Sequence, residues 1–138
     1  KRQTWALMEK GIVPKRVYLI HLSPINELAK ESRLMLDRLV TFHNECSIID
    51  MSVPYTELME FRHKINEIIE RETRLNSRVY IDITPGRKLF AVSLMSIPAI
   101  FKVESISYLF IDNLSDADYP YPMIPFKRQS LVEVEVRR

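Results

Sequence analysis

Residues 78–101 read RVYIDITPGRKLFAVSLMSIPAIF: a run of β-forming residues, a polar turn, and a second run that is almost wholly apolar. The first run, 78–84, predicts a strand, because Val, Tyr and Ile favour the pleated backbone. The second, 88–101, predicts an apolar helix that Pro98 kinks or ends. Gly86, one of only two glycines in the chain, lies in the turn and permits a tight bend there. A strand that turns tightly into a helix is a building unit of α/β folds.

The rest of the chain repeats this order of strand and helix. Ser23 is a candidate N-cap with Pro24 at the first helical position, and Gly11 is a candidate helix stop. The predicted strands are 16–23, 46–53, 78–84 and 106–112, and the predicted helices are 3–10, 23–42, 55–72 and 88–101.

The predicted strands are continuous apolar runs, as expected when helices cover both faces of a sheet. In the tail, Val132, Val134 and Val136 alternate with Glu133 and Glu135, which predicts a last strand with one wet face. We therefore expect a three-layer, Rossmann-like α/β sandwich whose mainly parallel sheet has antiparallel strands at its C-terminal edge. Doubly wound folds usually begin with a strand, whereas this sequence begins in its first predicted helix. The first strand is therefore absent from the sequence or arrives from elsewhere.

The composition favours one globular domain over residues 1–138, with 46% hydrophobic and 28% charged residues. The net charge of +2 is too small for a protein that coats nucleic acid, so we expect no direct binding to duplex DNA. The single cysteine, Cys46, cannot form an internal disulfide and fits a reducing compartment. No apolar run approaches the roughly 20 residues of a membrane span. We expect a cytoplasmic protein without membrane contact.

The polar turn DITPGRK, residues 82–88, can be interpreted in two ways. Ligands of α/β sheets bind beyond the carboxyl ends of strands, and Thr84, Gly86, Arg87 and Lys88 offer a hydroxyl, a bare backbone and two cations there. These features suit a phosphate or a nucleotide. A structural turn needs the same residue types, since Thr caps helices and Pro-Gly forms turns. The glycine spacings of a P-loop and of a dinucleotide fingerprint are both absent.

Asp82, Thr84 and Lys88 match the pattern [DN]-x-[ST]-x-x-x-[RK] that follows the fourth strand of CRISPR-associated Rossmann-fold (CARF) sensor domains. The similarity extends upstream to TWALMEKGIVPKRVYLIHLS and downstream to YLFIDN and YPYPMIP. The chain therefore resembles the CARF superfamily over about residues 4–126.

This resemblance implies a homodimer that binds a cyclic oligoadenylate, with cyclic tetra-adenylate as the first candidate, in a type III CRISPR antiviral system. It implies a fused or separate effector domain, and no cofactor or metal besides the ligand. Asp82 is expected to end the strand and organise the turn. Some members cleave the ring without metal through the ribose 2′-hydroxyl, and here Lys88 or Arg87 would stabilise charge on the phosphate. The implied ligand-binding residues are Ser23, Ser52, Thr84, Pro85, Gly86, Arg87 and Lys88.

Two other functions stay open. The chain can be a degenerate sensor fold that has lost its ligand and serves only as a dimerisation or scaffold module, and the missing first strand favours that interpretation. It can also be the sensor half of a transcription regulator. Among the remaining candidates, His21 follows a strand and could act as a general acid or base, although such a residue more often satisfies a local hydrogen bond. Cys46 is expected to be a structural thiol.

Overall fold

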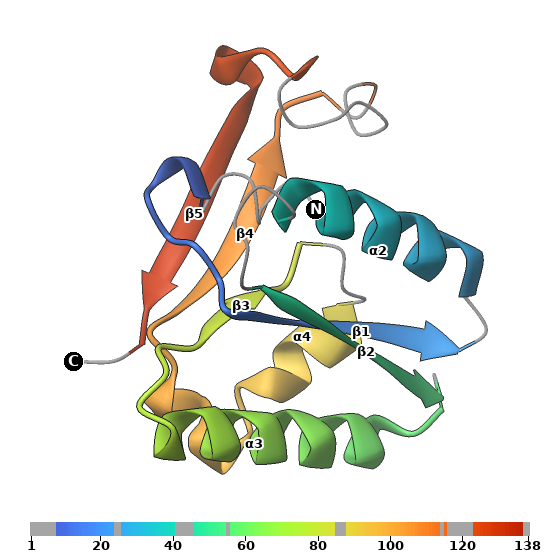
Figure 1. The fold of residues 1–138 in the computed structure, drawn as a ribbon, viewed down its shortest axis with the longest axis vertical. Helices are drawn as coiled ribbons and strands as arrows, with labels where there is room; N and C mark the ends of the chain where they lie inside the picture. The colour runs from blue at the N-terminus through green and yellow to red at the C-terminus, as the bar shows by residue number, and fades with distance from the viewer. Residues whose placement is uncertain are drawn as a thin grey trace. The chain divides into compact units, whose positions relative to one another are not determined.

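The computed structural model describes residues 8–23, 26–40, 46–54, 56–84, 88–113, 115 and 123–136, and their fold is mixed α/β (Figure 1). The chain divides into two compact units, Lys1–Glu57 and Leu58–Arg138. Each unit contains its own small sheet and is described by itself.

The first unit pairs two strands in parallel beside one helix. β1 (Arg16–Ser23) and β2 (Ser47–Pro54) are in register over the full length of both strands, and α2 (Asn26–Val40) connects them. Figure 1 shows α2 running along this two-stranded sheet. Leu36 of α2 and Val53 of β2 are 2% and 0% exposed, so both are core residues of the protein.

The second unit holds a three-stranded sheet with the order β3-β4-β5. β3 and β4 are parallel, whereas β4 and β5 are antiparallel. Its elements are α3 (Leu58–Arg74), β3 (Tyr80–Asp82), α4 (Lys88–Leu94), the 3₁₀-helix η1 (Pro98–Lys102), β4 (Ser105–Ile111), the 3₁₀-helix η4 (Phe126–Arg128) and β5 (Gln129–Glu135).

Several predicted boundaries are confirmed and one cap is wrong. The strand over 16–23 is confirmed at both ends. Gly11 adopts a positive φ of 80° and donates its N–H to the carbonyl oxygen of Met8 at 2.9 Å, which ends a short helical segment as predicted. Ser23 is not an N-cap, because it is the last residue of β1 and the helix begins only at Asn26. Pro24 lies outside the described residues.

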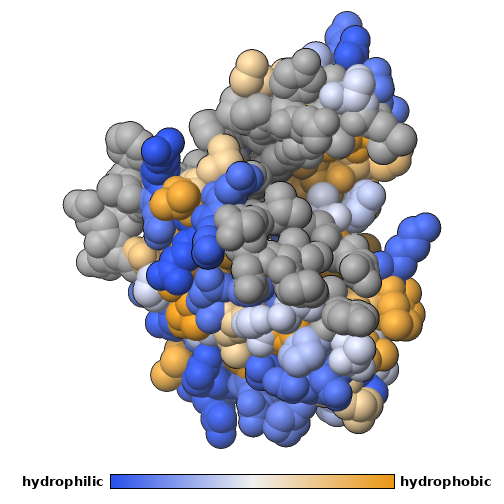
Figure 2. All heavy atoms as spheres, turned by 90° about the vertical axis from the view of Figure 1, so that its right-hand side faces the viewer, coloured by the Kyte–Doolittle hydropathy of each residue, from blue (hydrophilic) through white to orange (hydrophobic). Residues whose placement is uncertain are grey.

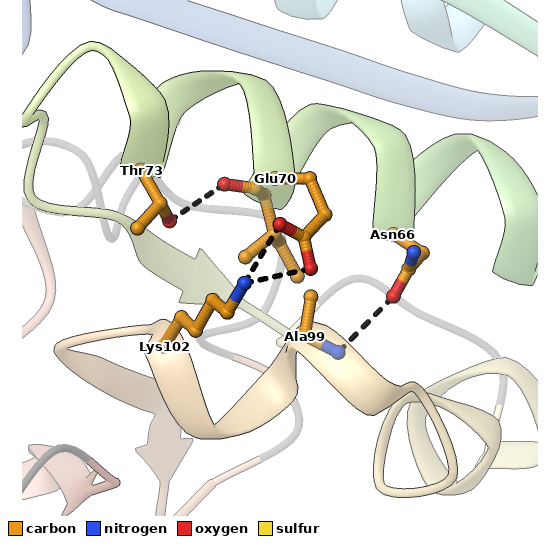
Figure 3. Close-up of polar contacts among 6 residues, drawn as sticks. Asn66, Glu70, Thr73, Ala99 and Lys102 are labelled. Atoms are coloured by element: carbon orange, nitrogen blue, oxygen red, sulfur yellow. Dashed lines mark hydrogen bonds and ion pairs between the residues drawn. The ribbon is translucent and has the colours of Figure 1, made fainter.

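The apolar helix predicted over 88–101 ends early, at Leu94, and the chain resumes as η1 at Pro98. Proline has no N–H to continue the helical ladder, which is the physical reason for the break. Figure 3 shows how α3 holds the new turn: the N–H of Ala99 donates to Oδ1 of Asn66 at 3.1 Å.

In the same view Nζ of Lys102 contacts both carboxylate oxygens of Glu70, at 2.8 and 2.7 Å (Figure 3). The side chains of Lys102 and Glu70 are 45% and 35% exposed. An ion pair at this exposure contributes little to stability, so the bond to Asn66 is the stronger link between α3 and η1.

The core of the second unit follows the predicted apolar stripe of α3. Phe61 packs edge-to-face on Phe90 of α4, with ring centroids 4.8 Å apart. Ile65 and Ile68 continue the stripe and are each 8% exposed. The opposite face carries ion pairs such as Lys64 with Glu60. Figure 2 accordingly shows a mostly hydrophilic surface at the lower end of the molecule, where α3 lies in Figure 1.

The last strand differs from the simplest expectation. The tail was expected to have one wet face, and the face that is most exposed is the apolar one: Val132 and Val134 are 50% and 60% exposed, whereas Glu133 is half-buried. Val132 lies opposite Tyr108 of β4, which is 44% exposed. Alternation determines which side chains share a face, but packing determines which face is covered.

Candidate functional site

The polar turn after β3 is held by hydrogen bonds of its own. Asp82 is the last residue of β3, and its Oδ1 accepts the backbone N–H of Thr84 at 2.7 Å. Oγ1 of Thr84 accepts the backbone N–H of Leu109 in β4 at 2.8 Å. Asp82 therefore ends the strand and organises the turn, as expected, and the hydroxyl of Thr84 ties the turn to the neighbouring strand.

Burial of the carboxyl group raises the pKa of Asp82 above its usual value, while hydrogen bonds from the backbone and the hydroxyl of Thr84 act in the opposite direction. The residue as a whole is exposed by area, although its carboxyl group is crowded by neighbouring atoms. The two hydrogen bonds from Thr84 favour the ionised form of this carboxyl group.

Lys88 is the first residue of α4 and is exposed. Its ammonium group forms no ion pair or hydrogen bond within the described part of the chain, unlike those of Lys64 and Lys102. Lys88 is thus a cation that an anionic ligand can reach. The other predicted contacts of this turn, Pro85, Gly86 and Arg87, lie outside the described residues.

The two predicted serines belong to the first unit. Ser23 ends β1 and is half-buried, and Ser52 lies near the end of β2 and is exposed. His21 pairs with Ser52 in the register of the two strands, and alternate residues of a strand share a face. Ser23, Ser52 and His21 therefore lie on one face of the two-stranded sheet.

That face also carries a charged cluster that was not predicted as a unit. Nε2 of His21 donates to Oδ1 of Asp50 at 2.9 Å, and Nη1 of Arg33 in α2 lies 3.7 Å from Oδ2 of Asp50. The cluster joins β1, β2 and α2. The parallel register pairs His21 with Ser52, which lies two residues after Asp50, so aligning the two predicted strands in parallel could have found this cluster.

His21 is poorly placed for acid–base chemistry. Its side chain is 17% exposed, and Nδ1 is buried without a hydrogen-bond partner in the described structure. A carboxylate only accepts hydrogen bonds, so Nε2 of His21 is the donor to Asp50 and is occupied by this local contact. The geometry favours the local-bond interpretation of His21 over that of a general base.

Cys46 is partly buried, and this burial raises the pKa of its thiol. A thiol with a raised pKa is a poor nucleophile at neutral pH, which agrees with the prediction of a structural cysteine. Among the described residues, no three His, Cys, Asp or Glu side chains lie close enough together to hold a metal ion. None of the helices in the described ranges is both long and apolar enough to cross a membrane.

Comparison with protein-family models, with curated proteins and with solved structures finds no match for this chain. The geometry of the turn, together with the sequence resemblance, is therefore the ground on which a function can be proposed.

Proposed function

We propose that this chain is a sensor of cyclic oligoadenylate, with cyclic tetra-adenylate as the first candidate, that acts as a homodimer in a type III CRISPR antiviral system. The observation that carries the proposal is the placement of the motif: Asp82 ends a parallel strand, Thr84 follows it and Lys88 begins the next helix. Ligands of α/β sheets bind at this end of a strand. The exposed ammonium group of Lys88 supplies a cation for a phosphate.

The same proposal includes the finer architecture, a three-layer Rossmann-like sandwich with a mainly parallel sheet. It is supported by parallel pairing of β1 with β2 and of β3 with β4, and by the antiparallel last strand β5. Helices that follow β1 and β2 along the chain fit the alternation that such folds require.

Slow ring cleavage is a further part of the proposal. The ribose 2′-hydroxyl would attack the adjacent phosphorus, the bond from phosphorus to the 5′-oxygen would break, and the departing oxygen would take up the proton. The protein would contribute mainly by holding the hydroxyl in line with the phosphorus. Lys88 or Arg87 would stabilise charge on the phosphate oxygens.

A second function is favoured by a specific observation. The hydroxyl of Thr84 already accepts the N–H of Leu109, and the carboxylate of Asp82 already accepts the N–H of Thr84. A turn whose polar groups are satisfied internally needs no ligand. This bonding supports a scaffold or dimerisation module that has kept the fold and does not bind nucleotide.

Calorimetric titration with cyclic tri-, tetra- and hexa-adenylate distinguishes the two, followed by chromatography of the recovered nucleotide. The sensor predicts tight binding of one ring size, at one ring for two chains, and a loss of about 1–3 kcal/mol of binding free energy in Lys88→Ala. Lys127→Ala is the matched control, because Lys127 is an exposed cation of the same unit outside the turn. Heat from none of the rings, with a folded chain, supports the scaffold instead. Equal binding by both variants means that Lys88 is not part of the site.

A further inference from the structure

Both hydrogen-bond donors of Thr84 are occupied by the side chain of Asp82. Oδ1 of Asp82 accepts the backbone N–H of Thr84 at 2.7 Å, and the carboxyl group also accepts the hydroxyl proton of Thr84. An ionised carboxylate only accepts hydrogen bonds. The two donors of this residue therefore already face a negative charge.

The bond from Leu109 leaves these two donors untouched. The N–H of Leu109 donates to Oγ1 of Thr84 at 2.8 Å, so it uses a lone pair of the hydroxyl and not its proton. Leu109 is 2% exposed, so water does not replace this bond easily. Thr84 is thus held to β4 by its acceptor, while its two donors can pass from one acceptor to another.

A phosphate group needs donors of the same kind. Phosphate oxygens are anionic acceptors, as carboxylate oxygens are, and proteins bind them through backbone N–H groups and hydroxyls. Each of the two donors of Thr84 carries one proton, and two negative charges held at one pair of donors repel each other. A phosphate that binds Thr84 must therefore take the place of Asp82.

Asp82 depends on Thr84 to stay ionised. Burial raises the pKa of its carboxyl group, and the bonds from the N–H and the hydroxyl of Thr84 are the main effects that oppose this rise. An anion that takes these donors also removes the groups that stabilise the charge of Asp82. Displacement of this carboxylate is therefore unfavourable, and a ligand binds more weakly by that amount.

We propose that the side chain of Asp82 is an intramolecular competitor of the ligand, which holds both donors of Thr84 until a phosphate group displaces it. This inference rests on the proposed function, because it names the residue that limits affinity at the proposed site. It also reconciles a turn that is satisfied internally with a ligand site, since the internal bonds are the ones that ligand binding replaces.

The test is calorimetric titration of cyclic tetra-adenylate into the wild-type chain, Asp82→Asn and Asp82→Ala. Asparagine keeps an oxygen that accepts the N–H of Thr84 and removes the charge, whereas alanine removes the competitor altogether. Glu67→Gln is the matched control, because it removes one negative charge at an exposed position of α3 in the same unit. Amide exchange at Leu109 reports in each variant whether Thr84 still bonds to β4.

We expect both Asp82 variants to bind about tenfold more tightly than the wild type, as for removal of a like charge beside an anion. Glu67→Gln should bind as the wild type does, and the amide of Leu109 should stay protected throughout. Binding by the Asp82 variants alone, with none by the wild type, also supports the competitor. If Asp82→Ala loses protection at Leu109, Asp82→Asn decides.

Equal or weaker binding by Asp82→Asn, with Leu109 still protected, overturns the inference and leaves the sensor standing, because the wild type still binds. Asp82 then supports the ligand. An equal gain in Glu67→Gln overturns it too, because the effect is then one of overall charge. No binding by the wild type or by either Asp82 variant, all of them folded, refutes the sensor and the competitor together.

Discussion

Replacing Thr84 with valine tests whether the turn after β3 is held by its own hydrogen bonds. Oγ1 of Thr84 accepts the N–H of Leu109 at 2.8 Å, and Leu109 is 2% exposed. Valine is similar in shape but cannot accept, so the buried N–H loses its partner. Such a loss costs about 1–3 kcal/mol. The carboxylate of Asp82 also loses a hydrogen bond from the hydroxyl, which adds to the effect.

Urea unfolding at neutral pH measures the free energy of unfolding, and amide exchange at Leu109 measures the local effect. Thr84→Ser is the control, because serine keeps the hydroxyl and loses one methyl group, worth about 0.8 kcal/mol or less at a partly buried site. We expect Thr84→Val to be the less stable variant and to expose the amide of Leu109 to faster exchange.

Two results together would refute this reasoning. The first is that Thr84→Val lowers the free energy of unfolding by less than about 0.5 kcal/mol, as an ordinary surface substitution does. The second is that the amide of Leu109 still exchanges slowly in this variant. The N–H would then have another acceptor. The hydroxyl of Thr84 would be available to a ligand after all, which would favour the sensor over the scaffold.

Three further predictions concern stability and reactivity. Asn66→Ala should lower the free energy of unfolding by about 1–2 kcal/mol, because the N–H of Ala99, a residue that is 1% exposed, loses its acceptor. The control Glu67→Ala, at an exposed position of the same helix, should lower it far less. Equal urea midpoints for the two variants would show that the N–H of Ala99 has another acceptor. The raised pKa of Asp82 means that the folded state binds its proton more tightly than the unfolded state, so stability falls as pH rises from about 4 through the folded pKa. The difference in free energy of unfolding between the wild type and Asp82→Asn should therefore decrease as pH rises through this interval and be constant above it. An increase of this difference with pH would contradict a raised pKa of Asp82. Burial raises the pKa of the Cys46 thiol, so Cys46 in the folded protein should react with iodoacetamide at pH 7.5 more slowly than glutathione does. The reaction of Cys46 should become faster in urea. A rate equal to that of glutathione in the folded protein would show that the thiol has an ordinary pKa.

Local sequence patterns predicted the elements well where one short-range signal dominates. The strand over 16–23 and the positive φ of Gly11 follow from residues that are close in sequence. The stripe of Phe61, Ile65 and Ile68 on α3 follows from helical periodicity. Boundaries were less predictable: the helix predicted over 88–101 ends at Leu94, and a separate 3₁₀-helix begins at Pro98.

The candidate site was predictable as a position but not as a set of bonds. The pattern predicted a strand over 78–84, which in the structure is only Tyr80–Asp82, so Asp82 ends it as the resemblance implied. Lys88 begins a helix, as the pattern predicted. The sequence could not show that Leu109, twenty-five residues after Thr84, donates to the hydroxyl. It also did not pair His21 with Asp50, whose contact exists only because two strands align in parallel.

The sequence by itself determined the alternation of strands and helices, because hydrophobic periodicity and turn residues act over a few positions. Only the tertiary structure decided which strands pair, which polar groups are already satisfied and which apolar face is exposed. Val132 and Val134 show the reason: their alternation with glutamates is local, but their exposure depends on what other parts of the protein cover. Pairing and burial are set by contacts between residues far apart in the chain, and no short stretch of sequence contains them.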